Sequence, residues 1–394
     1  MNLNHPANNV ERKGDYLEDK NVWVGVTGSV SCVETVGIIR ELLRYGARVT
    51  VVANRAALEL VGEKSLEFAC GKPIIKEITG QVEHVIAGHE ADLLMITPCC
   101  ATSLGKMVNG IGDNPPMLVA LTCIGAKTPM IVAPAMDKNM SDSDIVQKNM
   151  KSVKKFANVI EPVMIEGKAK LPSKERLVAE ACKMAGPKSL NRKKVLIMGG
   201  GSSEPIDDVR VISNRSSGRM AISLAESAFA MGADVDLWLG NASYEWGNWI
   251  KTTRFEALSK LRSLVKGMKR YDAVVVPAAL SDFIPEQAKG KLDSAKPITL
   301  KMKKAPKIIN GIRKKHKGLL YVFKLGARIS EKELLAKAKV LLKNANCVIA
   351  NHSKSMGSDK SKVAIIDKKN IVWISGSKVE ISNKILDKIA SELN

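Results

Sequence analysis

The sequence lacks the features typical of secreted and membrane-spanning proteins. Its seven cysteines form no CxxC pair, and Cys99 and Cys100 are adjacent, so a disulfide framework is not expected. The chain begins with no secretory leader, and no run of 18 apolar residues is free of charge. We therefore expect a soluble, cytoplasmic protein that keeps its thiols reduced and has no membrane partner.

Aromatic residues are also scarce, at 4% of the chain, whereas cations are abundant. The net charge is +21, and Lys and Arg outnumber Asp and Glu by 39 to 19 after Gly186 but only by 22 to 21 before it. Such an excess of cations would bind either a nucleic acid or small phosphorylated substrates, and part of it would simply form a solvated surface. Because aromatics are few and the lysines scattered, stacking of single-stranded bases is disfavoured. We expect no nucleic-acid partner.

Alternating strand and helix patterns predict two domains, since 394 residues exceed what one core usually organises. Residues 1–20 are polar and aperiodic, which predicts a flexible tail. Strands are expected at NVWVGV, RVTVVAN, ADLLMITP and TPMIVAPAM, and the pattern restarts after Gly186 with KVLIMGG, GADVDLWLG, YDAVVVPAA, LYVFKLG and NCVIAN. The expected fold class is α/β, with two doubly wound parallel-sheet (Rossmann-like) domains at 21–186 and 187–394.

The turn after the first expected strand is a candidate phosphate site. In open parallel sheets, ligands bind beyond the carboxyl ends of the strands, and VTGSVS places Gly28 and Ser29 there. The chain lacks GxGxxG, and the second strand ends at Asn54 rather than at an acidic residue, so classical NAD binding is disfavoured. By itself the turn suits a ligand-free connection equally well.

The segment VEHVIAGHEADLLMITPCCATSLGKMVNGIGDN, followed by VAPAMDKNM, resembles the flavin-dependent cysteine decarboxylases, whose best-known substrate is 4'-phosphopantothenoylcysteine. The resemblance implies an N-terminal flavoprotein fold that binds FMN. It also implies that His84 acts in the oxidative step and that Met136 and Asp137 hold the substrate carboxylate. The implied flavin-binding residues are Gly28, Ser29, Asn54, Pro98 and Thr102.

Two positions depart from this family. Asp137 stands where the family has asparagine, so its carboxyl is expected to be protonated or hydrogen-bonded, or else Asn139 takes over part of its role. The expected substrate flap, from Ile165 to Arg176, has no cysteine to act as proton donor. Lys168 or Lys170 in this flap would bind the substrate phosphate, and the proton donor is unassigned.

In the C-terminal half, GGGSSEPIDDVRVISNRSSGRMA predicts an anion cradle at a helix start, because glycine-rich turns and the SSG segment offer backbone N–H groups beside arginines. A Ser-capped helix is the alternative, but it explains only SSG. The stretch resembles the phosphopantothenate–cysteine ligases that are fused to such decarboxylases. The resemblance implies that Asn214 forms or consumes an acyl-nucleotide intermediate. The implied substrate-binding residues are Arg210, Ser216, Ser217 and Gly218.

Further matches to the ligases follow in chain order, in PAALSDF, GKLDS, LKMKKAPKII and LYVFKLG. They imply a nucleoside triphosphate, CTP in the family, together with Mg2+, although the sequence alone does not distinguish CTP from ATP and assigns no metal ligand. The implied nucleotide-binding residues are Ala278, Asp282, Lys291, Lys303, Lys304, Pro306, Phe323, Lys339 and Lys343. The last two are four residues apart, so they are expected to share one helix face.

Together these resemblances imply a bifunctional enzyme of coenzyme A biosynthesis. It would join cysteine to 4'-phosphopantothenate through an acyl cytidylate, and then decarboxylate the product to 4'-phosphopantetheine with FMN as transient electron acceptor. A homo-oligomer with trimeric decarboxylase contacts and dimeric ligase contacts is implied as well. The alternative is a flavin-binding regulatory protein without turnover, for which Asp137 and the cysteine-free flap are the best arguments.

Overall fold

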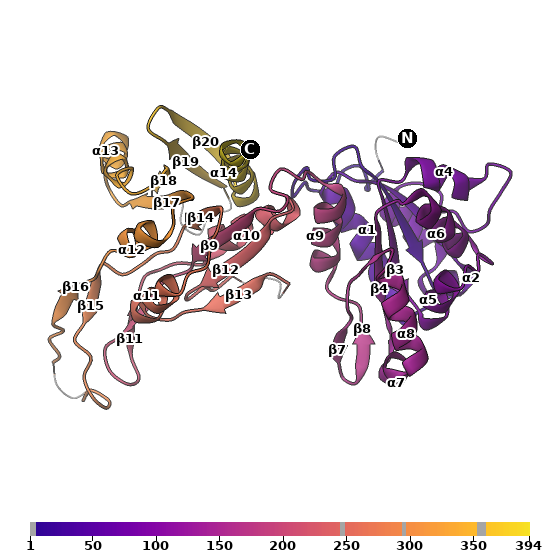
Figure 1. Ribbon diagram of the computed structural model, residues 1–394, viewed down its shortest axis with the longest axis horizontal. Helices are drawn as coiled ribbons and strands as arrows, with labels where there is room; N and C mark the ends of the chain where they lie inside the picture. The colour runs from indigo at the N-terminus through magenta and orange to yellow at the C-terminus, as the bar shows by residue number, and fades with distance from the viewer. Residues whose placement is uncertain (1–4, 245–248, 294–296, 353–359) are drawn as a thin grey trace. The chain divides into compact units, whose positions relative to one another are not determined.

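The computed structural model describes residues 5–244, 249–293, 297–352 and 360–394, and the chain divides into two compact units. The N-terminal unit is Met1–Pro187 and the C-terminal unit is Lys188–Asn394 (Figure 1). We had expected the boundary one residue earlier, after Gly186. Among the described residues, no helix is long and apolar enough to cross a membrane.

The N-terminal unit is built on a five-stranded sheet in the order β2-β1-β3-β4-β6, with every neighbouring pair parallel. All seven residues of β3 are buried, as expected of a parallel sheet covered on both faces. The strands are β1 (Asn21–Val26), β2 (Arg48–Ala53), β3 (Leu93–Cys99), β4 (Met130–Pro134) and β6 (Asn158–Val159).

Helices in two packed groups cover this sheet: α1 contacts α3 and α9, whereas α4 and α5 contact α6, and α5 also contacts α8 (Figure 1). The helices are η1 (Val30–Glu34), α1 (Thr35–Arg44), α2 (Arg55–Val61), α3 (Glu63–Cys70), α4 (Glu83–Glu90), α5 (Ala101–Val108), α6 (Pro115–Ala126), α7 (Lys138–Asp142), α8 (Asp144–Val153) and α9 (Lys174–Ala185).

The N-terminal segment corrects one expectation, because residues 5–20 are docked rather than flexible. Tyr16 and Leu17 are buried. The N–H of Leu17 donates to the carbonyl of Tyr45 at 2.9 Å, and Lys13 forms an ion pair with the buried Glu41 at 2.5 Å. The polar composition of residues 5–20 does not indicate these few anchoring contacts, because they depend on where α1 lies in the folded unit.

A second, smaller sheet in this unit has the order β5-β8-β7 and is antiparallel. Its strands are β5 (Met136–Asp137), β7 (Val163–Ile165) and β8 (Lys168–Lys170). The expected flap, Ile165 to Arg176, therefore begins as a β-hairpin that pairs with the turn after β4.

The C-terminal unit has an eight-stranded sheet in the order β13-β12-β9-β14-β17-β18-β19-β20. The expected parallel α/β fold is confirmed from β13 to β18, but β19 and β20 are antiparallel, which the sequence did not predict. The strands are β9 (Lys194–Gly199), β12 (Asp234–Leu239), β13 (Lys251–Arg254), β14 (Ala273–Val276), β17 (Leu319–Gly326), β18 (Cys347–His352), β19 (Lys360–Ile366) and β20 (Ile371–Ser377).

Among the described residues of this unit, five helices and two hairpins accompany the sheet (Figure 1). The helices are α10 (Arg219–Ala230), α11 (Leu258–Lys266), α12 (Ile308–Lys315), α13 (Glu331–Leu341) and α14 (Lys378–Leu393). The hairpins pair β10 (Ser203–Pro205) with β11 (Val211–Ser213), and β15 (Phe283–Pro285) with β16 (Met302–Lys304).

Both sheets have a point where the strand order reverses. In the N-terminal unit β1 lies between β2 and β3, and in the C-terminal unit β9 lies between β12 and β14. Successive crossovers leave the central strand in opposite directions there, which opens a crevice at the C-terminal edge of the sheet, where the parallel strands end. These two crevices are where ligands of open α/β sheets bind.

Candidate active sites

The crevice of the N-terminal unit is closed at its base by Thr27, which follows β1. Its Oγ1 donates to the carbonyl of Pro98 at 2.8 Å and accepts the N–H of Cys100 at 3.1 Å, so the turn after β1 is tied to the loop after β3. Pro98 is buried in β3, whereas Thr102 is exposed in the first turn of α5. The sequence had indicated both loops but not Thr27 as their link.

The remaining expected flavin-binding residues lie at the same edge. Ser29 Oγ donates to the carbonyl of Ala135 at 3.4 Å, and Asn54 caps α2 by accepting the N–H of Ala57 at 2.9 Å. A Cβ on Gly28 would lie 2.6 Å from the methyl carbon of Ala56. The contact with α2 therefore accounts for a glycine at this position, whereas the sequence led us to expect a phosphate close to its backbone.

His84 lies in the first turn of α4. Its Nδ1 is buried and has no hydrogen-bond partner among the described residues. A buried imidazole nitrogen without a partner is costly in a folded protein unless a ligand or water satisfies it. This atom therefore fits a site completed by a bound group, such as a flavin with its substrate.

The substrate side of this crevice is formed by the small antiparallel sheet. Met136 pairs with Ala169, and Asp137 pairs with Lys168. The Asp137 carboxylate accepts the N–H of Asn139 at 2.8 Å, which is the hydrogen-bonded alternative considered above. Lys170 forms an ion pair with Glu166 at 3.1 Å, which leaves Lys168 as the flap cation beside Asp137.

In the C-terminal unit, the glycine-rich turn after β9 is shaped by close backbone packing. Gly200 has φ of 75°, and a Cβ there would lie 2.8 Å from the carbonyl oxygen of Asn241. A Cβ on Gly199 would lie 2.0 Å from the methyl carbon of Ala221 in α10. Only glycine permits this combination, so the turn brings backbone N–H groups close to the start of α10.

Asn214 follows β11 and reaches across the crevice to the loop after β14. Its Nδ2 donates to the carbonyl of Ala279 at 3.0 Å, and Ala279 also accepts the N–H of Ser202 at 3.2 Å. The buried Ser202 hydroxyl lies 2.9 Å from the Ser281 hydroxyl and accepts the Ser281 N–H at 3.0 Å. Three loops distant in sequence therefore meet at Asn214, and the serines were quoted in the sequence motifs but not recognised as their link.

The SSG segment forms the start of α10. Gly218, with φ of 72°, is the N-cap residue and makes no side-chain cap. The hydroxyls of Ser216 and Ser217 accept the N–H groups of Gly218 and Arg219, each at 3.4 Å. The positive end of the helix dipole and the Arg219 guanidinium make this the more electropositive side of the crevice.

Arg210, expected to contact substrate, instead holds protein groups. It forms an ion pair with the buried Asp207 at 3.3 Å and donates to the carbonyl of Leu292 at 3.2 Å. Asp207 also accepts the N–H groups of Leu292, Val209 and Arg210. These hydrogen bonds lower the pKa of the Asp207 carboxyl, and the bond from the Leu292 N–H has the largest effect. The result is that the loop carrying the exposed Lys291 is fixed beside Arg210.

The loop after β14 and the β15–β16 hairpin carry several predicted nucleotide-binding residues. Ala278 precedes Ala279 in this loop, and Asp282 forms an ion pair with Lys307 at 2.5 Å, a lysine that the sequence motifs did not single out. Lys303 pairs with Glu286 at 2.9 Å. The other residues of the group lie nearby in sequence or in the sheet, namely Lys304 in β16, Pro306 after it, and the half-buried Phe323 within β17.

Lys339 and Lys343 are not brought together with these residues. The helix α13 crosses back from the end of β17 to the start of β18, and it ends at Leu341, so Lys343 lies at the opposite, N-terminal edge of the sheet. There it lines a cleft with Arg313 and Lys388. The expectation that both lysines contact nucleotide phosphates is therefore wrong for this structure, because the crossover is antiparallel to the strands.

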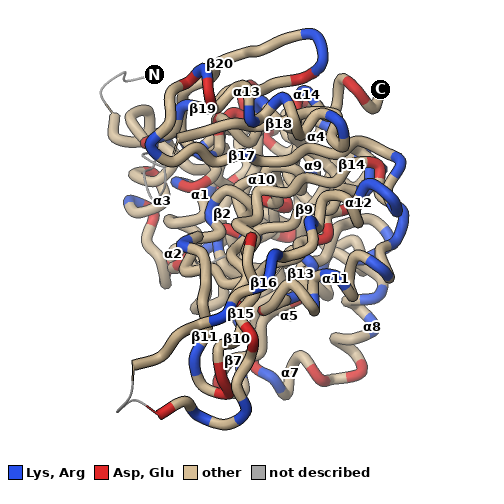
Figure 2. Tube along the Cα trace, turned by 90° about the vertical axis from the view of Figure 1, so that its left-hand side faces the viewer, with Lys and Arg blue, Asp and Glu red and all other residues tan. Residues whose placement is uncertain are grey.

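Much of the basic excess of the C-terminal unit lies at the same N-terminal edge. Lys and Arg gather around the ends of α11 and α12 (Figure 2), where the last turns carry Lys266, Arg313, Lys314 and Lys315. These four cations lie away from the crevice, so the expectation that the basic excess serves phosphorylated substrates does not extend to them. Among the described residues, no group of three or more His, Cys, Asp or Glu side chains could hold a metal ion.

Comparison with known proteins follows the same division. Residues 10–186 match the Flavoprotein family, and residues 190–393 match the DNA/pantothenate metabolism flavoprotein C-terminal domain. The crevice geometry and these matches define a two-unit flavoprotein of the α/β class.

The relatives are similar over nearly their whole length. The Coenzyme A biosynthesis bifunctional protein CoaBC of Thermococcus kodakarensis is 37% identical over 394 residues, which cover 97% of each chain. The protein of the same name from Methanocaldococcus jannaschii is 36% identical and covers 96% of this chain and 95% of its own. The crystal structure of a CoaBC C-terminal domain is 24% identical, covering 52% of this chain and 98% of its own, with a TM-score of 0.45. The chain belongs to the CoaBC family of coenzyme A biosynthesis bifunctional proteins.

Proposed function

We propose that the C-terminal unit joins cysteine to 4'-phosphopantothenate and that the N-terminal unit decarboxylates the product to 4'-phosphopantetheine. The family makes the chain a bifunctional decarboxylase and ligase of coenzyme A biosynthesis. The observation that carries the proposal is the meeting of Asn214, the glycine-rich turn and the loop after β14 in one crevice, in a chain that also contains a separate flavoprotein unit. A regulatory protein without turnover would not need this ligase crevice.

In the ligase unit, the substrate carboxylate must first gain a leaving group. We propose that its oxygen attacks the α-phosphate of CTP, which releases pyrophosphate and forms an acyl cytidylate. The cysteine amine then attacks the acyl carbon, and CMP leaves as the amide forms. We propose that Asn214, Lys291 and Arg219 orient these anions and offset their charge; Asn214 is held at the loop after β14, and Arg219 at the start of α10. Mg2+ would arrive with the triphosphate, since Mg2+ in such sites is held largely by substrate phosphates.

In the decarboxylase unit, the residues at the C-terminal edge fit FMN and its substrate. Bound FMN supplies the electron acceptor that loss of CO2 from a cysteine-derived carbon requires, and it returns the electrons afterwards. Thr27, Ser29 and Asn54 hold the three loops that would surround it. The partnerless Nδ1 of His84 is placed to accept or return a proton, and Lys168 beside Asp137 would offset the substrate's negative charge.

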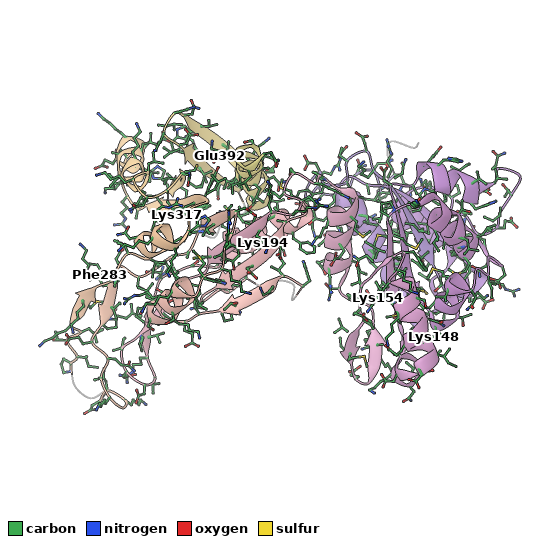
Figure 3. The ribbon with its side chains drawn as sticks, viewed as in Figure 1. Lys148, Lys154, Lys194, Phe283, Lys317 and Glu392 are labelled. Atoms are coloured by element: carbon green, nitrogen blue, oxygen red, sulfur yellow. The ribbon has the colours of Figure 1, made fainter. Side chains whose placement is uncertain are left out.

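Exposed apolar side chains support the proposed homo-oligomer. Val30 is 75% exposed on η1, directly after the flavin turn, and Phe283 is 56% exposed on the β15–β16 hairpin (Figure 3). Contact between subunits would remove these two side chains from water, and burial of apolar surface favours association. We propose a cytoplasmic homo-oligomer in which like units contact one another, trimeric through the decarboxylase and dimeric through the ligase.

One experiment tests both halves of the proposal. The purified chain is incubated with 4'-phosphopantothenate, cysteine and either CTP or ATP, and the products are weighed by mass spectrometry. We expect 4'-phosphopantetheine, CMP and CO2 with CTP. Absence of 4'-phosphopantothenoylcysteine with both nucleotides would contradict the ligase, whereas its accumulation without CO2 release would contradict the decarboxylase. A colourless preparation that takes up no FMN would contradict the flavin site.

A further inference from the structure

The segment Asn241–Tyr244, which follows β12, forms a wall of the ligase crevice that the sequence motifs did not indicate. The N–H of Gly201 donates to the carbonyl of Asn241, and the N–H of Asn241 donates back to the carbonyl of Gly201, both at 2.8 Å. The N–H of Tyr244 donates to the carbonyl of Ser217 at 3.1 Å. The segment is therefore fastened to the glycine-rich turn at one end and to the start of α10 at the other.

Two further contacts join this segment to the start of α10. A Cβ on Gly218 would lie 2.6 Å from the methyl carbon of Ala242, so the backbone at the start of α10 lies directly against the segment. The guanidinium carbon of Arg219 lies 5.2 Å from the centroid of the Tyr244 ring. This distance is within the range in which the ring face attracts a cation.

We propose that Tyr244 is a positioning residue of the ligase: its ring holds the Arg219 guanidinium at the start of α10, where it binds a phosphate oxygen of a substrate. The inference rests on the proposed ligase function. An arginine side chain has several rotatable bonds, and restricting them before the substrate arrives lowers the entropy cost of binding. A guanidinium can remain stacked on an aromatic face while its N–H groups donate to phosphate. The phosphate belongs to 4'-phosphopantothenate or to CTP, which share this chemistry.

The test compares Tyr244→Ala with Tyr244→Phe in the full chain. Kinetics are measured with each substrate varied in turn. We expect Tyr244→Ala to raise the KM of one phosphorylated substrate about two- to fivefold, with kcat and the KM for cysteine nearly unchanged, because the Tyr244 ring is exposed and an exposed cation–π contact is worth about that factor. The substrate whose KM rises identifies the source of the phosphate. Tyr244→Phe keeps the ring face and should behave as the wild type.

A double-mutant cycle tests whether Tyr244 acts through Arg219. If it does, Arg219→Ala and the double variant Arg219→Ala/Tyr244→Ala should have the same KM, because the ring has no other target. Additive effects of the two substitutions would overturn the proposal, as would an equal loss in Tyr244→Phe and Tyr244→Ala. Should the alanine variant fail to fold, Tyr244→Leu retains apolar packing without the ring face and replaces it in the same comparison.

Two controls separate this inference from its premises. Release of CO2 from supplied 4'-phosphopantothenoylcysteine uses the N-terminal unit, so it should be equal in all variants. Failure of the proposed function would appear in the wild-type chain, which would then form no amide product. A failure of the inference alone would leave the wild type active, with the KM values of Tyr244→Ala unchanged.

Discussion

Replacing Asn214 with aspartate changes one donor into an acceptor at the centre of the ligase crevice. Asn214 Nδ2 donates to the carbonyl of Ala279 at 3.0 Å, and an aspartate oxygen at that position would face this carbonyl oxygen without a proton between them. The net loss from a neutral hydrogen bond is about 1 kcal/mol. Ala279 also keeps the N–H of Ser202 as a partner. Since a domain has about 5–15 kcal/mol of stability, Asn214→Asp should still fold.

The effect on catalysis should be much larger than the effect on stability. Removing a polar group that stabilises the charge of an acyl-transfer step costs about 100- to 1000-fold in rate, and the new carboxylate also repels the anionic substrates. We therefore expect Asn214→Asp to stall ligation around the acyl nucleotide. The measurement is mass spectrometry of the mixture together with cysteine-dependent release of CMP.

Two controls make this result interpretable. Asn191→Asp carries the same change just before β9, at the far edge of the sheet, and should ligate normally. Release of CO2 from supplied 4'-phosphopantothenoylcysteine should be unaffected in both variants. Normal ligase turnover in Asn214→Asp would refute the role assigned to this residue.

Three further outcomes are expected. His84→Asn should lower CO2 release at least 100-fold while ligation continues, because the proton transfer loses its group; an unchanged rate would remove this assignment. Lys291→Ala should raise the KM for the nucleotide about tenfold, because Lys291 stands in the GKLDS motif that is expected to bind phosphates, and Lys343→Ala should leave it unchanged, because Lys343 lies at the opposite edge of the sheet; equal effects would contradict this difference. The hydrogen bond from Lys388 lowers the pKa of Asp367 to about 2. The stabilisation that the ionised Asp367 carboxylate gives to the folded state is therefore present above about pH 4, and it is lost as the pH falls toward about 2. Unfolding by urea across this range should show Asp367→Asn less stable than the wild type at pH 5 and converging with it near pH 2, and a constant difference would argue against this linkage.

Local sequence patterns were sufficient to predict most strands of both parallel sheets, but not the short edge strands β6 and β13. Runs such as NVWVGV and KVLIMG are buried on both faces, and a glycine, Gly28 or Gly200, comes within two residues after each run. The antiparallel strands β19 and β20 were not predicted: β20 lies at the edge of the sheet and has no fully buried residue, and β19, which pairs with both β18 and β20, begins with the polar run KSK. The docking of residues 5–20 was missed for a similar reason, since it depends on a few contacts with α1 and the chain that follows it.

What the sequence determined by itself was the chemical content of the two crevices. Gly200 and Gly218 have backbone conformations that other residues rarely adopt, and Asn214 stands in the motif from which its role was predicted. Which side chains share a site was decided only by the tertiary structure. Tyr244 reaches Arg219 because β12 pairs beside β9, whereas Lys343 is removed from the crevice because α13 crosses the sheet in the opposite direction. The distance between residues in an α/β fold is set by strand order and crossover direction, and neither can be predicted from a short stretch of the sequence.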